Sequence, residues 1–289
     1  MQRRLFNNGL ALACLAASPM GIPRTAQAAT APWAAIEKSV GGRLGTAVLD
    51  TATGRVTGHR LDERFPMCST FKWLAAALAL KRADQGEERM DRRVRYDASV
   101  LLAHSPFAEK HVGDGATVAE LCEAAVTLSD NAAANLLLTS FGGPQAITAF
   151  ARSLGDTMTR LDRTEPSLNQ AKPGDPRDTS TPRAMAGALN AAVLGSALTA
   201  ASREQLTQWL RATRTGDKRL RAGLPADWLA GNKTGTGARG TTNDVAVVWP
   251  PGRAPLVVVA FLTECEAPAD AREGALAQVG RQAATVVPG

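Results

Sequence analysis

Aromatic residues, cysteine and histidine are scarce in this chain of 289 residues: aromatics make up 4%, and there are four Cys and three His. The histidines, His59, His104 and His111, are separated and lack the HxH or HExxH spacing of zinc sites, so we exclude a zinc hydrolase and expect no cofactor. No Lys/Arg-rich run is interleaved with aromatic residues, and we therefore expect no nucleic-acid partner.

Long apolar runs are also absent. Beyond the N-terminus, no run approaches the ~20 residues of a membrane-spanning helix, so we expect no membrane insertion. With 45% hydrophobic and 21% charged residues, the chain can bury a core and is not disordered. At about 150 residues per domain, its length predicts about two structural domains.

The first 28 residues have the order of a signal peptide. Arg3 and Arg4 come first, an apolar run covers residues 9–17, and Ala26 and Ala28 form an AxA-type cleavage site. We therefore expect export to the periplasm and removal of residues 1–28. The arginine pair also resembles a twin-arginine signal, so the Sec and Tat routes both stay open. Since the segment holds three of the 33 basic residues and no acidic one, the remainder carries a net charge of +3.

Three cysteines, Cys68, Cys122 and Cys265, remain after Cys14 leaves with the signal peptide. They are too few and too scattered for a disulfide framework or a paired CxxC zinc site. Because their number is odd, at least one thiol is free or bonded to another molecule.

Strand signals lie near both ends of the remaining chain. Residues 43–50 and 55–60 form a predicted hairpin, and the Val-rich runs 243–249 and 256–263 flank a Pro-Pro-Gly turn. We predict a helix before the first pair, over residues 32–39, and another after the second pair, from residue 269.

Helical signals dominate the middle. Residues 71–83 are Ala-rich, Thr117 and Glu120 have capping-box spacing, and further helices are predicted over 131–140 and 181–192. Residues 160–178 form a long Pro-rich loop, and loops of that length are often functional. The pattern predicts an α+β fold: a sheet domain made of residues 29–61 and 213–289, with an all-α domain, residues 62–212, inserted.

Ser69 and Lys72 form an SxxK motif, which places both side chains on one helix face, one turn apart. The ammonium can then reach the hydroxyl, which is a poor nucleophile until a neighbour accepts its proton. Because Pro66 precedes them, Ser69 is expected near the helix start, where free N–H groups favour negative charge. Alone, the motif is common on helix surfaces.

Two further motifs follow in a fixed order. Ser129-Asp130-Asn131 is expected at a junction of two helices, and Lys233-Thr234-Gly235 where a strand begins. Each alone is weak, since SDN is often a helix cap and KTG a turn. Together with SxxK they form the motif set of class A β-lactamases and penicillin-binding proteins. Over nearly the whole chain after residue 28, the sequence resembles a class A serine β-lactamase.

Glu165 and Asn169 match the ExxLN motif that separates the hydrolases from their transpeptidase relatives. A carboxylate and an amide four residues apart can hold one water between them. The resemblance further implies a five-stranded antiparallel sheet flanked by terminal helices, a cis peptide bond before Pro166, and an ion pair between Arg163 and Asp178 that closes the loop.

The resemblance also implies the role of each residue in the site. Ser69 is the expected nucleophile, Lys72 and Glu165 are both candidates for the acylation base, and Ser129 relays a proton to the leaving nitrogen. Glu165 with Asn169 activates the hydrolytic water. The backbone N–H groups of Ser69 and Thr236 form the expected oxyanion hole. The expected substrate-binding residues are His104 at the cleft mouth, Asn131 for the side-chain amide of the drug, and Lys233, Thr234, Gly235 and Thr236.

The sequence departs from common family patterns in three places. The strand position after KTG that often holds an arginine is Thr242, and Arg219 is the expected substitute. The disulfide of many carbapenem-hydrolysing members cannot form, because Cys68 faces Gly237. The disulfide of other members is also excluded, since the position paired with Cys122 is Ala76.

The predicted activity is therefore hydrolysis of penicillins and cephalosporins through a serine acyl-enzyme, giving antibiotic resistance. We expect a monomer whose partners are β-lactam antibiotics. The alternatives are a peptidoglycan transpeptidase or carboxypeptidase, or a sensor that stays acylated. Both would lack the pairing of Glu165 with Asn169, and a sensor also needs a membrane segment or a signalling domain.

Overall fold

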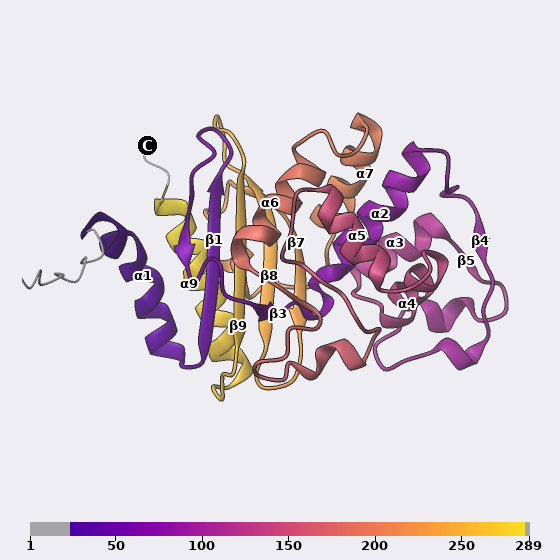
Figure 1. Cartoon of the computed structure of the whole chain (residues 1–289), viewed down its shortest axis with the longest axis horizontal. Coiled ribbons are helices and arrows are strands. Elements are labelled where there is room, and N and C mark those ends of the chain that lie inside the picture. Colours follow the sequence, from indigo (N-terminus) through magenta and orange to yellow (C-terminus); the bar gives the residue numbers. More distant parts are fainter. Residues whose placement is uncertain (1–23, 287–289) are drawn as a thin grey trace, which may run out of the picture.

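The computed structural model describes residues 24–286, and an antiparallel sheet of five strands runs through the middle of them (Figure 1). Most of the predicted signal peptide, residues 1–23 with Cys14, lies outside the described residues. The strands lie side by side in the order β2 (Val56–His59), β1 (Arg43–Asp50), β9 (Leu256–Thr263), β8 (Thr242–Trp249) and β7 (Leu229–Thr236).

Both faces of the sheet are buried, against different helices. The terminal helices α1 (Arg24–Val40) and α9 (Ala269–Thr285) pack on one face, and α6 (Pro182–Val193) packs on the other (Figure 1). Side chains alternate along a strand, so Val257, Val259 and Phe261 of β9 join the core of the helical region, while their neighbours join the core under the terminal helices. This two-sided burial explains the continuous apolar runs of the central strands.

The helical region lies beyond the β7 edge of the sheet (Figure 1). Its central helix is α2 (Lys72–Asp84), of which residues 72–80 are all buried because other helices surround them. Around α2 lie α3 (Val118–Thr127), α4 (Asn131–Ser140), α5 (Gln145–Ser153) and α7 (Ala200–Arg211). The capping box predicted at Thr117 and Glu120 is present at the start of α3.

The α+β fold with a five-stranded antiparallel sheet and terminal helices is confirmed. The strands come from the two ends of the described chain, and the helices of the other region lie between them in sequence. The division into a sheet domain and an all-α domain at residues 61/62 and 212/213 stays a prediction. Between residues 24 and 286, no helix has the length and apolar character needed to cross a membrane.

Two boundaries differ from the predicted ones. Helix α1 begins eight residues earlier than predicted, at Arg24, because the Ala-rich sequence before Pro32 favours a helix. The KTG motif lies in the second half of β7 and not at a strand start. The strand begins at Leu229, where Leu-Ala-Gly-Asn carries no β-branched residue and so gives no strand signal, yet pairs in register with β8.

Candidate functional site

A cleft of about 360 Å³ lies where the end of β7 meets the helical region. Nine of the residues predicted for the site line it. The lining consists of Ser69, His104, Ser129, Asn131, Asn169, Thr215, Arg219, Thr234, Gly235 and Thr236. The other three predicted residues, Lys72, Glu165 and Lys233, are buried and bond to residues of the wall.

Ser69 lies in a short 3-10 helix, Cys68–Phe71, that leads directly into α2. The nucleophile candidate therefore sits at a helix start, as predicted, and is 8% exposed. Its hydroxyl donates a hydrogen bond to Oε1 of Glu165 over 3.0 Å. A carboxylate at this distance can accept the serine proton directly.

Lys72 lies one helical turn after Ser69, but its ammonium does not bond to the serine hydroxyl. It donates to the backbone oxygen of Ser129 (2.8 Å) and to Oδ1 of Asn131 (2.6 Å), and it pairs with Oε1 of Glu165 (3.1 Å). Lys72 and Ser69 thus meet at the same carboxylate oxygen. The direct contact of ammonium and hydroxyl expected from SxxK is not made; Glu165 links the two groups instead.

Ser129 connects the two buried lysines at the junction of α3 and α4. Its hydroxyl accepts a hydrogen bond from Nζ of Lys233 (3.0 Å), while its backbone oxygen accepts the one from Lys72. A positive φ of 60° at Ser129 turns the chain so that both contacts are possible. This places in the cleft wall a hydroxyl that is bonded to Lys233.

Burial lowers the pKa of both lysines in the site, Lys72 and Lys233. It lowers the pKa of Lys72, against the attraction of Glu165. It lowers the pKa of Lys233 well below the usual range, and repulsion by Lys72 adds to the effect. Lysines with depressed pKa values can exchange protons near neutral pH, as acid–base groups must.

Both backbone groups of Glu165, its N–H and its oxygen, are hydrogen-bonded to one side chain. Asn135 on α4 donates to the backbone oxygen of Glu165 (2.9 Å) and accepts from its N–H (3.0 Å). The Glu165–Pro166 bond is cis, as the resemblance implies. Asn169 donates from Nδ2 to Oε2 of Glu165, and its Oδ1 is buried without a protein partner among residues 24–286. An acceptor in that position can take a hydrogen bond from a water that Glu165 also binds.

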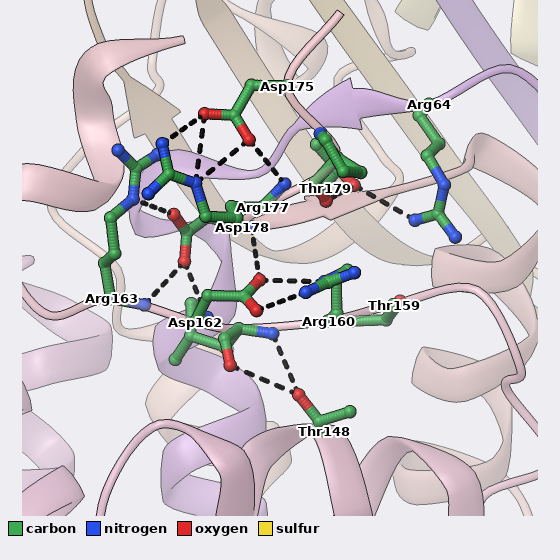
Figure 2. A network of polar contacts seen from close by, with 12 residues as sticks. Arg64, Thr148, Thr159, Arg160, Asp162, Arg163, Asp175, Arg177, Asp178 and Thr179 are labelled. Atoms are coloured by element: carbon green, nitrogen blue, oxygen red, sulfur yellow. Dashed lines mark hydrogen bonds and ion pairs between the residues drawn. The ribbon is translucent and has the colours of Figure 1, made fainter. Parts of the chain in front are cut away.

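The loop that carries Glu165 is closed by ion pairs of three aspartates, of which Asp178 is buried (Figure 2). Asp178 is 1% exposed, accepts from the backbone N–H groups of Asp162 (2.8 Å) and Arg163 (2.9 Å), and pairs with Nε of Arg163. The predicted Arg163–Asp178 pair is therefore present. Around it, Asp162 pairs with Arg160 and Asp175 with Arg177. Charge-assisted bonds of this kind fix the loop ends and so the carboxylate of Glu165.

Gly237 allows the end of β7 to approach the nucleophile. A Cβ at this position would lie 2.6 Å from Sγ of Cys68 and 2.9 Å from the backbone oxygen of Asn169. The next residue, Ala238, donates its N–H to that same oxygen. The missing side chain thus brings the strand against both the Ser69 turn and the Glu165 loop.

Arg219 lies beside the position of the missing strand arginine. Its guanidinium donates to the backbone oxygens of Gly235 (3.0 Å) and Asn243 (2.8 Å) and to Oγ1 of Thr236 (2.9 Å). Thr236 is paired in register with Thr242, the strand position in question. A buried cation therefore stands at the end of β7 and lines the cleft.

Two of the predicted substrate-binding residues, Asn131 and His104, form hydrogen bonds within the protein. Asn131 accepts from Lys72 and donates to the backbone oxygen of Ala103 (2.8 Å). His104 lies at the cleft with a positive φ of 61°, its Nε2 2.9 Å from the backbone oxygen of Leu128. Both residues line the cleft, as expected, but each also holds the loop before α4 in place.

Sequence reasoning missed Asn135, Thr215, Asn232 and Asp244. Asn135 carried a usable signal, because it lies one turn after Asn131 on the same face of α4. Thr215 bonds through its hydroxyl to that of Thr234 (2.8 Å) across a gap of 19 residues. Asn232 and Asp244 bond to each other beneath the same segment (2.9 Å). No local pattern marks these long-range contacts.

Asp244 gives the first testable prediction. Burial raises the pKa of its carboxyl to about 6, although Asn232, Arg219, the Leu220 N–H and Lys233 favour the charged form. The folded protein therefore holds this proton to higher pH than the unfolded chain, and the resulting stabilisation is lost as pH rises from about 4 through 6.

In Asp244→Asn this proton uptake is removed. The free energy of unfolding of the variant, relative to the wild type, should rise by about 3 kcal/mol between pH 4 and pH 7. Urea titrations at several pH values measure it. A difference that stays constant over this range would contradict the assignment.

The cysteine thiols form no disulfide in the described residues, and these residues contain no cluster of metal ligands. Cys68, Cys122 and Cys265 are buried and free, and burial raises the pKa of the first two. The Cys68 thiol is therefore protonated and packs as a small apolar group. Within residues 24–286, no three His, Cys, Asp or Glu side chains converge as a metal site requires.

Comparisons with known proteins agree with this geometry. The pattern of the Beta-lactamase enzyme family matches residues 29–287. The chain is 51% identical over 248 residues to β-lactamase CTX-M-8 of Citrobacter amalonaticus, covering 86% of this chain and 85% of that one. It is 48% identical to the carbapenem-hydrolyzing β-lactamase KPC of Klebsiella oxytoca, covering 89% of each.

Solved structures show the same likeness. An ancestral class A β-lactamase superposes with a TM-score of 0.88 at 64% identity, covering 90% of this chain and all of the other. The putative class A β-lactamase PenP from Rhodopseudomonas palustris superposes with a TM-score of 0.89 at 60% identity, with the same coverage.

Proposed function

The chain belongs to the class A β-lactamases and hydrolyses β-lactams through a serine acyl-enzyme; from this premise we propose that Ser69 is the nucleophile and that Glu165 completes the reaction. The observation that carries the proposal is the meeting of Ser69 Oγ and Lys72 Nζ at Oε1 of Glu165. Nucleophile, base and cation are joined there through one atom.

In acylation, Ser69 Oγ attacks the lactam carbonyl while its proton passes to a neighbouring base. Glu165 is in direct contact, and Lys72, with its lowered pKa, is the second base within the same cluster. The helix start at Ser69 and the end of β7 at Thr236 supply backbone N–H groups for the oxyanion. Both bases therefore serve this step.

When the lactam C–N bond breaks, the nitrogen needs a proton. Ser129 supplies it from its hydroxyl and is reprotonated by Lys233, which bonds to that hydroxyl. The depressed pKa of Lys233 makes this donation easier than from an exposed lysine. Ser129 thus works on the leaving group while Glu165 works on the nucleophile.

In deacylation, Glu165 acts as the base. After acylation, the proton taken from Ser69 returns through solvent to Lys233, so that Glu165 is again a carboxylate. Glu165 and Asn169 then bind a water between them, and Glu165 takes the proton of this water as its oxygen attacks the ester. Asn135 and the ion pairs of the loop keep the carboxylate facing Ser69. The ester is then cleaved, Ser69 recovers its proton, and the enzyme can turn over again.

Substrate binding uses the charged end of β7. Arg219, with Lys233, Thr234 and Thr236, binds the carboxylate of the antibiotic, and Gly235 lets the strand edge approach it. Asn131 and His104 on the opposite wall bind the side chain of the drug. The positive charge gathered at this end of the cleft supports the assignment.

A peptidoglycan transpeptidase or a β-lactam sensor would share Ser69, Lys72 and the KTG strand. The pairing of Glu165 with Asn169 favours hydrolysis, since it holds the second nucleophile, water, against the acyl-enzyme. Steady-state assays separate the three activities: we expect many penicillin molecules hydrolysed per enzyme and no cleavage of a D-Ala-D-Ala peptide. One penicillin consumed per enzyme would contradict hydrolysis; cleavage of the D-Ala-D-Ala peptide would then identify a transpeptidase or carboxypeptidase, and no cleavage a sensor.

We also propose that the protein is exported to the periplasm after removal of residues 1–28 and acts there as a monomer. The pattern of the Beta-lactamase enzyme family begins to match at residue 29, the first residue after the proposed cleavage site. Export by either route would place the enzyme where β-lactams meet the cell wall.

Arg219→Ala gives a second prediction. Because hydrogen bonds to charged groups contribute about 1.5–3 kcal/mol, kcat/KM for a penicillin should fall about ten- to a hundredfold. Steady-state kinetics measure the loss, and a melting curve verifies that the variant is folded.

Lys218→Ala is the matched control, since its side chain is 73% exposed and pairs only with Asp270 at the surface. Arg221 cannot serve, because it bonds to Asn232 beneath the cleft. Equal losses in the Arg219 and Lys218 variants would indicate a general effect of charge and remove Arg219 from the site.

A further inference from the structure

Arg219 and Thr215 belong to a segment, residues 212–219, that has no helix or strand of its own. It connects α7 to the short helix α8 (Leu220–Gly223) and lies along β7. A segment of this kind has no strand ladder to fix it. One backbone hydrogen bond, from Arg214 N–H to the oxygen of Thr127, ties it to α3, and the side chains beneath it help to determine where its two cleft residues lie.

Asp244 is the fully buried carboxylate beneath this segment. It lies on β8 opposite Thr234 and accepts hydrogen bonds from Nδ2 of Asn232 (2.9 Å) and from the N–H of Leu220 (3.3 Å), the residue after Arg219. Asn232 in turn accepts from Nη2 of Arg221 (2.7 Å). Asp244 on β8 is therefore joined to Asn232 on β7 and to Leu220, the first residue of α8.

The fit above this cluster is close. A Cβ at Gly216, whose φ is +92°, would lie 2.7 Å from both Nδ2 of Asn232 and Cγ2 of Thr234, and 3.5 Å from Oδ2 of Asp244. The segment therefore rests directly on Asn232 and Thr234. A small movement of the Asn232–Asp244 pair would displace the residues on either side of Gly216, which include Thr215.

A contribution to the stability of the fold does not by itself explain why an aspartate occupies position 244. A fully buried carboxylate that accepts two hydrogen bonds carries a desolvation cost, which the raised pKa reflects. The charged groups on the elements around it include Lys233 on β7, Arg219 and Arg221 on the segment and α8, and Arg272 and Glu273 on α9. None of them forms an ion pair with Asp244 in the described part of the chain.

We propose that Asp244 is a positioning residue for substrate binding: through Asn232 and the Leu220 N–H, it holds Arg219 and Thr215 over the end of β7, where the carboxylate of the β-lactam binds. This inference rests on the proposed function and adds to it. It makes Asp244 act through Arg219, without touching the substrate.

The test is a double-mutant cycle of Asp244→Asn and Arg219→Ala with a penicillin as substrate. Asn cannot accept from both donors at once, so one of the two anchors is lost. We expect Asp244→Asn to raise KM about tenfold and to change kcat less than about threefold. In the Arg219→Ala background the same change should alter KM less than about twofold, because the group to be positioned is gone.

Asp156→Asn is the matched control, a second buried carboxylate that bonds to Met158 and Thr159 outside the cleft. It should leave KM unchanged. Melting curves add a readout: Asp244→Asn should raise KM without lowering the melting temperature at pH 7, whereas a purely structural role would lower it.

Three results would overturn the inference. The first is an unchanged KM in Asp244→Asn, and the second is a lowered KM, which would mean that the negative charge of Asp244 only repels the substrate carboxylate. The third is full additivity of Asp244→Asn with Arg219→Ala. None of these results would affect the proposed function, because the wild type would still hydrolyse penicillin. A wild type that does not turn over penicillin would instead refute the proposed function.

Discussion

Ser69→Ala should abolish covalent labelling of the protein by penicillin and lower turnover on the order of 10⁵-fold or more. The reason is geometric: Ser69 lines the cleft, and its Oγ bonds to the carboxylate that also binds Lys72, so a base is in contact with it. Alanine keeps the packing of the helix start but removes the atom that forms the ester. Intact-protein mass spectrometry detects the adduct directly.

Ser167→Ala is the control for this variant, since Ser167 is exposed on the loop next to Glu165. It should acylate and turn over as the wild type does. An adduct that persists in Ser69→Ala would show that another residue is the nucleophile.

Glu165→Ala should still be acylated by a good penicillin but should release the product about 10²- to 10⁴-fold more slowly. Lys72 remains as a base for acylation, and the loss of its carboxylate partner lowers its pKa further. No second carboxylate is hydrogen-bonded to Asn169 in the described chain, so the deacylating water loses its base. The acyl-enzyme should therefore accumulate.

A time course by mass spectrometry follows the accumulated adduct. Glu165→Gln, which keeps the size of the side chain and loses the charge, should behave in the same way and exclude a collapse of the loop as the cause. Undiminished steady-state turnover in either variant would contradict the role of Glu165 and favour a transpeptidase-like site.

The fold was predictable where local patterns are strong. The Val-rich strands β8 and β9, the hairpin of β1 and β2 and the capped helix α3 follow from alternation, turn residues and a capping box. The first half of β7 was not, because Leu-Ala-Gly-Asn becomes a strand only through its pairing with β8. Tertiary contacts override weak local propensity there.

The site shows the same division. Ser69, Lys72 and Glu165 belong to short motifs with fixed spacing, and the structure brings them to one oxygen atom. Asp244 and Thr215 belong to no motif. Their contacts cross from one element to another over 12 and 19 residues, and such pairs become visible only when the strands are in register.

The most direct test of the account is a rapid-quench experiment on the wild-type enzyme with benzylpenicillin, followed by mass spectrometry of its peptides. We expect a transient adduct on the peptide that contains Ser69, which forms before the hydrolysed product and decays at the rate of turnover. Hydrolysis at full rate with no adduct on that peptide at any time would contradict it.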